Sequence, residues 1–288
     1  MSPSEGPCEG LLLIDKPQGP TSHDVVDVVR RSLGTRKVGH AGTLDPMASG
    51  LLVVCVGRAT RLLRYLSGLD KTYEGTARLG EETDTLDADG EIVARSDVAV
   101  TEERLRDIVS TFAGPIQQIP PAHSAVKVDG EPAYRAARRG EEVRTVPRTV
   151  RIDRFDVTGY DGVRDFDFAV DCSGGTYIRS LVADVGRTLA CGAHLTRLRR
   201  TRVGPFTLAQ ACAPDDLAVP LPLETAVAHL PCLDLDEHEA EAAGFGRPLG
   251  PAGVEGPYGV YGPDGKLIGI YRDDVAKAKP EMILAPPA

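Results

Sequence analysis

The pattern of apolar and polar positions predicts a series of short strands and helices up to about residue 210. Two continuous apolar runs, 11–14 and 51–56, are typical of buried strands, because a strand that is covered on both faces shows no alternation. Further strands are expected at 71–78, 150–158, 165–172 and 195–203. Apolar residues at helical spacing, with Thr101 as one helix cap, predict helices at 59–66, 101–112 and 176–190.

Cap residues set the ends of two more predicted helices. Thr21 or Ser22 is expected to cap a helix that Gly34 stops, since Ser and Thr accept hydrogen bonds from the free N–H groups of a helix start. The apolar face of this helix is formed by Val25, Val26, Val28, Val29 and Leu33. Pro132 is expected in the first turn of an Arg-rich helix that Gly140 closes.

The character of the sequence changes after residue 210. Prolines become frequent, at positions 214, 220, 222 and 231, which is typical of a linker zone. The residues 256–272 are typical of a hairpin around the turn 263–265. We expect a boundary near 225–232, with a main domain at 1–228 and a small, mostly β domain at 229–288. Since helices and antiparallel strands interleave without regular strand–helix–strand spacing, the expected fold class is α+β.

The composition is that of an ordinary globular protein and excludes several classes. The chain has 288 residues, of which 42% are hydrophobic and 26% charged. Its longest apolar run, 51–56, is far shorter than the ~18 residues of a membrane-spanning helix. Its acidic start lacks the basic region of a signal peptide. Six scattered cysteines without a Cys-x-x-Cys pair favour a reduced cytoplasm over a disulfide framework or a zinc site.

The net charge hides an uneven distribution. With 33 basic and 42 acidic residues the formal net charge is −9, which taken alone argues against a nucleic-acid partner. Three segments are nevertheless basic: 30–71 carries +6, 178–202 carries +5 and 127–154 carries +3. The acidity lies in 81–110, at −7, and in 210–288, at −8. Each basic segment can be a solvated face, but because charges are screened beyond ~10 Å, three of them favour an anionic partner.

The sequence contains no motif for a common cofactor or metal. It holds no Gly-x-x-x-x-Gly-Lys-Ser/Thr loop for a triphosphate and no Gly-x-Gly-x-x-Gly for a dinucleotide. The six histidines show no ligand-type spacing, and no Gly-x-Ser-x-Gly turn presents a serine nucleophile. The segment 85–90 resembles half of a calcium loop, but Thr85 and Ser96 stand where carboxylates belong. We expect chemistry by side chains alone, without cofactor or metal.

The candidate catalytic loop is the glycine-rich segment 39–50. Pro46 pushes Asp45 out of helical geometry, which places a carboxylate on a turn directly before the buried strand 51–56. A carboxylate on a fixed loop inside a basic segment suits a nucleophile or a base. The alternative is that Asp45 only caps a local turn, as Asp commonly does.

Five segments stand out in order along the chain: 15–22 (DKPQGPTS), 39–50 (GHAGTLDPMASG), 71–75 (KTYEG), 174–181 (GGTYIRSL) and 192–201 (GAHLTRLRRT). Together they resemble the motifs of the TruB family of tRNA pseudouridine synthases. The resemblance covers about residues 10–207. It implies a mixed, largely antiparallel sheet with a cleft across its middle, and a PUA-like module at 229–288. It implies inserted RNA-contacting segments at about 81–150.

The implied activity is the conversion of uridine to pseudouridine in the T-loop of tRNA, at position 55, with base flipping and without cofactor or metal. The expected partner is the T-arm stem-loop of tRNA rather than DNA or a membrane. The expected enzyme is a cytoplasmic monomer.

The resemblance also implies roles for individual residues. Asp45 is the catalytic carboxylate, acting on the ribose as a nucleophile or a base, and Arg179 is its ion-pair partner. Tyr73 is grouped with them because it is expected to stack on the uracil, although an aromatic residue on a strand can equally belong to the core. Tyr177 and Leu198 are expected to line the same pocket, with plain core packing as the alternative for Leu198.

Further candidates lie around this pocket. His40 is expected to enter the T-loop or to support the flipped bases, or else to bond only to the local backbone. Lys16 either holds the first motif against the catalytic loop or contacts phosphate. The acidic, turn-rich loop 81–91 is expected to fold over the RNA. The predicted helix 132–140 is expected to contact phosphates through Arg135, Arg138 and Arg139.

The sequence leaves other functions open. The basic segments and His40 are also typical of an RNA-binding and folding module, with catalysis secondary or with a chaperone role beside catalysis. A place in a guide-RNA particle, as for archaeal and eukaryotic relatives of the family, is disfavoured by the acidic C-terminal residues and the lack of lysine-rich tails.

Overall fold

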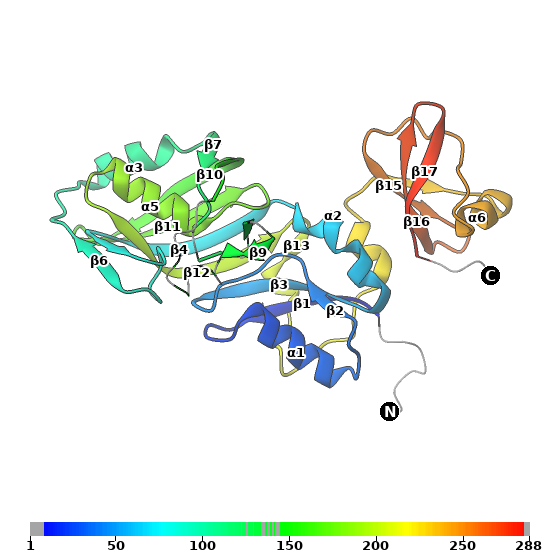
Figure 1. The fold of residues 1–288 in the computed structure, drawn as a ribbon, viewed down its shortest axis with the longest axis horizontal. Coiled ribbons are helices and arrows are strands. Elements are labelled where there is room, and N and C mark those ends of the chain that lie inside the picture. The colour runs from blue at the N-terminus through cyan, green and yellow to red at the C-terminus, as the bar shows by residue number, and fades with distance from the viewer. Residues whose placement is uncertain are drawn as a thin grey trace.

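A computed structural model describes residues 9–284 except 122, 125, 129, 134, 135, 137, 138, 140 and 142–144. Within these residues, a large sheet of nine strands forms the body of the protein and a four-stranded sheet follows it at the C-terminal end (Figure 1). The strand order in the large sheet is β1, β3, β12, β4, β11, β10, β7, with β2 paired to β3 and β13 to β12. The bounds are β1 Gly10–Lys16, β2 Val38–His40, β3 Ala48–Val56, β4 Lys71–Leu79, β7 Gly114–Gln118, β10 Arg148–Tyr160, β11 Asp165–Cys172, β12 Ala193–Val203 and β13 Phe206–Thr207.

The large sheet is mixed, because its central strands β3 and β12 run parallel. They pair over a short stretch, from Leu198 opposite Ala48 to Arg200 opposite Gly50, whereas the other pairings are antiparallel. Position 50 requires glycine, since a Cβ there would lie 2.3 Å from the carbonyl oxygen of Arg200 and its φ is +102°. The structure confirms the α+β class with a mixed, largely antiparallel sheet.

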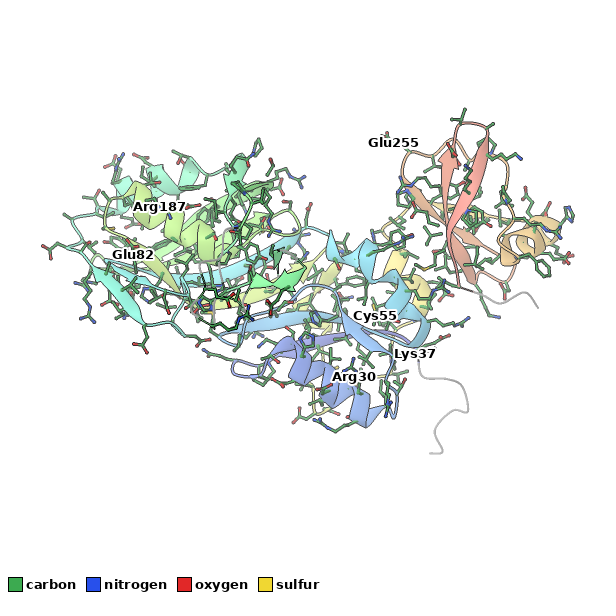
Figure 2. All side chains as sticks on the ribbon, viewed as in Figure 1. Arg30, Lys37, Cys55, Glu82, Arg187 and Glu255 are labelled. Carbon is green, nitrogen blue, oxygen red and sulfur yellow. The ribbon has the colours of Figure 1, made fainter. Side chains whose placement is uncertain are left out.

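The continuous apolar runs of β1 and β3 arise because these strands are covered on both faces. On one face, β1 and β3 pack against η1 (Gly57–Leu62) and α2 (Leu63–Ser67), and on the other against α1 (Ser22–Ser32). The first face holds Leu11, Leu13, Leu51, Val53 and Cys55, and the second Leu12, Ile14, Leu52, Val54 and Val56. In Figure 2, Cys55 lies within this part of the molecule and Lys37 at its surface.

Both predicted caps of the threonine type are confirmed. The side chain of Thr21 accepts from the backbone N–H of Asp24, and Gly34 follows α1 with a φ of +62°. The side chain of Thr101 accepts from the backbone N–H of Arg104 and starts α3 (Glu102–Ser110).

A third core lies between the sheet and the two helices α3 and α5 (Ile178–Thr188), which lie over the same part of it in Figure 1. In this core, α3 packs mainly on β10 and α5 on β12. Among the described residues, no helix is long and apolar enough to cross a membrane.

The acidic segment 81–91 is not wholly a loop. It begins with β5 (Glu81–Thr83), which pairs antiparallel with β6 (Ile92–Arg95) and so forms a small hairpin that projects from the large sheet (Figure 1). Hydrogen bonds within the segment stabilise this hairpin in spite of the turn-rich composition. The Thr83 hydroxyl donates to the carbonyl of Asp87, and the N–H of Asp84 donates to the carbonyl of Glu91.

The helix predicted to begin at Pro132 is wrong at its first residue. Pro132 ends the short strand β9 (Glu131–Pro132), which pairs with β8 (Lys127–Val128). The pairing tolerates proline at this strand end, and the next residue, Ala133, donates to the carbonyl of Val126. The predicted phosphate contacts Arg135 and Arg138 lie outside the described residues, as does Gly140, and Arg139 forms ion pairs with Glu131 and Glu141.

The C-terminal part is a small sheet in the order β14, β15, β16, β17 with one helix, α6 (Glu237–Gly244). Its strands are β14 Cys232–Asp234, β15 Pro257–Tyr261, β16 Leu267–Asp274 and β17 Lys277–Ile283, and the short helices η2 (Leu208–Gln210) and η3 (Leu223–Val227) precede it. The predicted hairpin 256–272 is confirmed as β15 and β16. The division at 228–229 stays a prediction.

Candidate active site

A cavity of about 230 Å³ opens where β3, β12 and β4 lie side by side. Its walls come from the loop between β2 and β3, from β4, from β12, and from the start of α5 with the turn before it. The predicted residues Asp45, Tyr73, Tyr177, Arg179 and Leu198 all line it. The structure therefore brings together side chains from four motifs that are far apart in the sequence.

The catalytic loop is fixed in place by the segment 15–22. The Ser22 hydroxyl donates to the carbonyl of Leu44 at 2.9 Å and accepts from the N–H of the same residue at 2.8 Å. The N–H of Gly19 donates to the carbonyl of Pro46 at 2.8 Å. Because Ser22 is buried, these bonds exchange little with water and hold the two loops together.

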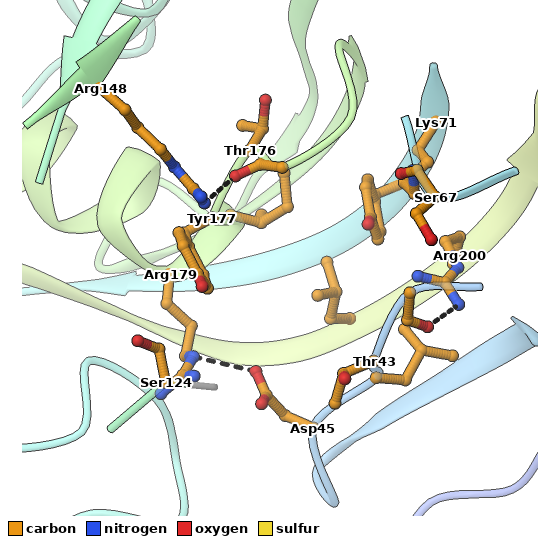
Figure 3. Close-up of a pocket in the computed structure, with 16 residues that line it drawn as sticks. Thr43, Asp45, Ser67, Lys71, Ser124, Arg148, Thr176, Tyr177, Arg179 and Arg200 are labelled. Atoms are coloured by element: carbon orange, nitrogen blue, oxygen red, sulfur yellow. Dashed lines mark hydrogen bonds and ion pairs between the residues drawn. The ribbon is translucent and has the colours of Figure 1, made fainter. Parts of the chain in front are cut away.

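Arg179 holds the carboxylate of Asp45 in one direction. Its Nε lies 3.0 Å from Oδ2 of Asp45, and its side chain is only 5% exposed (Figure 3). Its Nη1 lies 3.3 Å from Oδ2 of Asp87 and donates to the carbonyl of Thr85 at 2.9 Å, while Nη2 donates to the carbonyl of His123 at 2.9 Å. Because both terminal nitrogens of the guanidinium are held, its Nε faces Asp45 in a fixed orientation.

The protein environment raises the pKa of Asp45. Burial is the largest cause, the Arg179 guanidinium opposes it, and the negative charges of Asp87 and Asp89 add to the rise. The side chain still keeps 35% of its exposure, so the carboxylate is surrounded by protein and remains open toward the cavity. A carboxylate that is both oriented and more basic than usual suits either a nucleophile or a base.

Tyr73 and Leu198 form the apolar surface of the cavity. Tyr73 on β4 lies opposite Arg200 on β12, and Leu198 lies opposite Gly75 on the same two strands. The Arg200 guanidinium lies 6.0 Å from the centre of the Tyr73 ring, and burial raises the pKa of the Tyr73 hydroxyl. Both side chains are also part of the core beneath α5, so packing and cavity lining coincide at these positions.

Tyr177 lies directly before α5 and is held by its backbone. Its N–H donates to Oε1 of Gln118 at 2.7 Å, and its carbonyl accepts from Nε2 of the same side chain at 3.0 Å. The Arg148 guanidinium lies 4.5 Å from the centre of the Tyr177 ring. The ring is thus fixed at the rim of the cavity (Figure 3).

Two predicted residues lie outside the cavity wall. His40 on β2 packs edge-to-face against His23, with 5.4 Å between the ring centres, and burial lowers its pKa to about 4. Lys16 is fully buried, and its Nζ donates to the carbonyls of Pro17 and Pro20 at 2.9 and 2.7 Å. Burial lowers the pKa of Lys16 to about 8. Both bonds of the ammonium go to the backbone of the segment 15–22.

The sequence did not single out four polar residues of this site: Lys71, Asp87, Arg148 and Arg200. Lys71 and Arg200 line the cavity without a carboxylate partner among the described residues, and burial lowers the pKa of Lys71 to about 8. Lys71 and Arg200 belong to two of the recognised segments, 71–75 and 192–201, but no local signal marks Lys71, since Asp70 and Glu74 lie close to it in the sequence. Nothing local distinguishes Asp87 or Arg148 from the other charged residues around them.

Metal binding finds little support in the side chains present. The described residues contain no group of three or more His, Cys, Asp or Glu side chains placed to hold a metal ion. Asp45, which lines the cavity, and Asp87 are instead both paired with Arg179.

Comparisons with known proteins agree on one family. The protein-family model described as "TruB family pseudouridylate synthase (N terminal domain)" matches residues 30–178. The models described as "tRNA pseudouridylate synthase B C-terminal domain" and "tRNA Pseudouridine synthase II, C terminal" match residues 179–228 and 230–285.

Curated relatives carry the similarity over nearly the whole chain. The chain is 49% identical to tRNA pseudouridine synthase B of Mycobacterium sp. (strain KMS), with 96% of each protein covered. It is 48% identical to the protein of the same name from Arthrobacter sp. (strain FB24), with 96% and 97% covered, and 47% identical to that of Thermobifida fusca (strain YX), with 96% and 99% covered.

Solved structures share the fold. A Cbf5–Nop10–Gar1 complex contains a chain with a TM-score of 0.76 and 27% identity, covering 96% of this chain and 85% of that one. The archaeal box H/ACA Nop10–Cbf5 complex gives 0.75 and 27%, covering 98% and 88%. Fold, cavity and relatives together define a pseudouridine synthase, which is an isomerase. The chain belongs to the TruB family.

Proposed function

We propose that this enzyme converts uridine to pseudouridine at position 55 in the T-loop of tRNA, as a monomer in the cytoplasm and without a cofactor. The observation that carries the proposal is the Asp45–Arg179 ion pair in a cavity that also presents the apolar surface of Tyr73 and Leu198. A ribose belongs at the carboxylate and a uracil belongs against Tyr73 and Leu198. The relatives that are named tRNA pseudouridine synthase B support tRNA as the substrate.

The geometry suggests a division of labour. The carboxylate of Asp45 acts at the ribose while the bond from C1′ to N1 of the base breaks, and the base rotates and rejoins C1′ through C5. C5 then loses its proton and N1 gains one, so that the product is an isomer of the substrate. Arg179 keeps the carboxylate ionised and aimed, because an ion pair of this kind favours the charged form. Tyr73 offers a flat surface to a uracil that has left its stack, a contact of about 1–3 kcal/mol. Tyr177 closes the rim on the opposite side.

Residues beside the cavity have supporting roles in this proposal. Lys16 keeps the segment 15–22 in the shape that anchors the catalytic loop, through its bonds to two carbonyls. His40 remains a neutral ring at physiological pH because burial lowers its pKa to about 4. A neutral ring beside His23 can fill the space that a flipped base leaves, and such opening and closing of the T-loop would also assist tRNA folding.

The test is mapping of pseudouridine in a tRNA transcript that is incubated with the pure protein and EDTA. We expect one modified position, in the T-loop. Asp45→Asn should abolish the product, whereas Asp97→Asn, which changes an exposed carboxylate remote from the cavity, should leave the rate unchanged. Modification elsewhere in the RNA, or modification that requires an added guide RNA, would overturn the proposal.

A second measurement separates catalysis from RNA folding. The Asp45→Asn protein is added to a misfolded tRNA transcript and recovery of the native form is followed. Undiminished recovery would support a folding role that is independent of the chemistry. Loss of recovery together with loss of pseudouridine would leave catalysis as the whole function.

A further inference from the structure

Among the described residues, Arg148 is a cation that lines the cavity and has no carboxylate partner. It is the first residue of β10, and its guanidinium lies 4.5 Å from the centre of the Tyr177 ring and donates to the carbonyl of Gly175. Its Nε is buried and has no hydrogen-bond partner in the described part of the chain. A guanidinium carries five N–H groups, and most of those of Arg148 are unused.

The neighbouring arginines of β10 make the contrast clear. Arg151 lies 2.9 Å from Asp70 and 2.7 Å from Asp153, and Arg154 lies 2.8 Å from Asp171. By contrast, no carboxylate of the described residues lies within 4.0 Å of the Arg148 nitrogens, although carboxylates are common on this sheet.

The position of Arg148 is fixed by its neighbours in the sheet. Its backbone pairs with Gln118 on β7, and the Gln118 side chain is the one that holds both backbone groups of Tyr177. Arg148, Gln118 and Tyr177 therefore form one rigid cluster. Gly175 adopts a φ of +86°, and a Cβ at this position would lie 3.7 Å from the guanidinium carbon, so the turn before α5 packs closely against Arg148.

The distribution of charge around the cavity indicates which part of a nucleotide Arg148 binds. Asp45 lines the cavity, and Asp87 and Asp89 lie close enough to raise its pKa, so a phosphate is disfavoured beside these carboxylates. The base and ribose of the substrate are accounted for by Tyr73 and Asp45. The part of a nucleotide that remains is its phosphodiester, and guanidinium groups match phosphate oxygens in a two-point fork.

We propose that Arg148 binds a phosphodiester group of the RNA backbone next to the nucleotide that occupies the cavity. The inference rests on the proposed function in that it needs an RNA substrate.

The test uses Arg148→Gln, which keeps a donor for the carbonyl of Gly175 and removes the charge. Binding of a T-arm stem-loop is measured over a range of salt concentrations in the Asp45→Asn background, so that the RNA is not converted. We expect the dissociation constant to rise about five- to tenfold. The slope of log K against log salt should become less negative by about 0.7–0.9, which corresponds to one lost phosphate contact.

The matched control is Arg151→Gln on the same strand, which removes a charge that carboxylates already pair. Its salt slope should equal that of the parent protein. With Asp45 intact, Arg148→Gln should raise KM while kcat stays within about twofold. If Arg148 served only to support Tyr177, kcat would fall and the salt slope would stay unchanged, and the inference would be wrong.

An RNA in which one phosphate is replaced by an uncharged linkage identifies the phosphate that Arg148 contacts. Methylphosphonate linkages are placed on the 5′ or the 3′ side of the target uridine, and binding to the parent and to Arg148→Gln is compared. One linkage should weaken binding to the parent and leave binding to Arg148→Gln unchanged. Equal weakening of both proteins by both linkages would overturn the inference. If wild-type protein forms no pseudouridine in tRNA, the proposed function fails instead, so the two failures are distinct.

Discussion

The Nη1 atom of Arg179 lies 3.3 Å from Oδ2 of Asp87, so one guanidinium holds two carboxylates, those of Asp45 and Asp87. Asp87 comes from the acidic segment 81–91, and its side chain is 5% exposed. The negative charge of that segment would repel an RNA backbone, and the structure explains part of this charge. One of its carboxylates is turned inward and acts as a counter-ion for the arginine of the cavity.

Asp87→Asn should lower kcat and leave KM nearly unchanged. The amide keeps the shape of the side chain and loses its charge, so Arg179 is less firmly oriented toward Asp45. We expect a loss of about tenfold, or ~1.4 kcal/mol in the activation free energy. The measurement is single-turnover pseudouridine formation. Glu91→Gln, an exposed change in the same segment, serves as the control, and an unaltered rate in Asp87→Asn would contradict the prediction.

The pH dependence of the single-turnover rate should report Asp45. Its pKa is raised by burial and by the charges of Asp87 and Asp89, and the active form is the carboxylate. The rate should therefore fall on the acidic side at a pH above the ordinary Asp value of 3.8. In Asp87→Asn one of the charges that raise the pKa is gone, so the acidic limb should move to lower pH. A shift to higher pH would disprove this coupling.

Lys16 should make the protein more stable at alkaline pH. Its pKa is about 8 in the folded protein, against 10.5 for an ordinary lysine. Between these values the unfolded chain binds more protons than the folded one, so the free energy of unfolding rises with pH, by roughly 3 kcal/mol at most. Urea unfolding at pH 7.5 and pH 10 measures it.

Two variants isolate that contribution. Lys16→Met removes the buried amine, so the rise in the free energy of unfolding between the two pH values should be smaller than in wild type. Lys37→Met changes an exposed lysine and should keep the wild-type rise. Equal rises in all three proteins would show that Lys16 is charged to the same extent in the folded and unfolded states.

Substitutions of Tyr73 should separate its ring from its hydroxyl. Tyr73→Phe keeps the stacking surface, so binding of the T-arm should stay within about twofold of the Asp45→Asn parent. Tyr73→Ala removes a contact of about 1–3 kcal/mol and should raise the dissociation constant about five- to 150-fold. Because Tyr73 is also buried, a thermal melt must show that the Ala variant is folded. Unchanged binding by a folded Ala variant would exclude stacking.

Much of the fold could be predicted from local signals. The apolar runs of β1 and β3 predicted strands that are buried on both faces, and the structure shows the reason, since alternate side chains enter two different cores. The caps at Thr21 and Thr101 could be predicted because each depends only on a hydrogen bond within the first turn of its helix. Pro132 was not, because the pairing of β8 with β9 decides its conformation and depends on residues outside the local pattern.

The basic segments show where sequence-based reasoning about charge fails. Strand β12 gives the segment 178–202 much of its net charge, yet three of its arginines are paired with carboxylates on other strands: Arg197 with Asp167, Arg199 with Asp15 and Arg202 with Asp171. Charge that is summed along the chain cannot reveal such pairs, because they form across the sheet. The unpaired cations of the cavity, such as Arg148, are equally hidden until strands are aligned.

The helix α2 also couples two distant parts of the protein. Arg64 and Tyr65 on this helix contact Glu281 of β17, at 3.1 and 2.7 Å, while Ser67 at its end lines the cavity. The small C-terminal sheet is thus attached to the same five-residue helix that forms part of the cavity rim. The cavity and the small C-terminal sheet are therefore joined directly by α2, through Ser67 on one side and Arg64 and Tyr65 on the other.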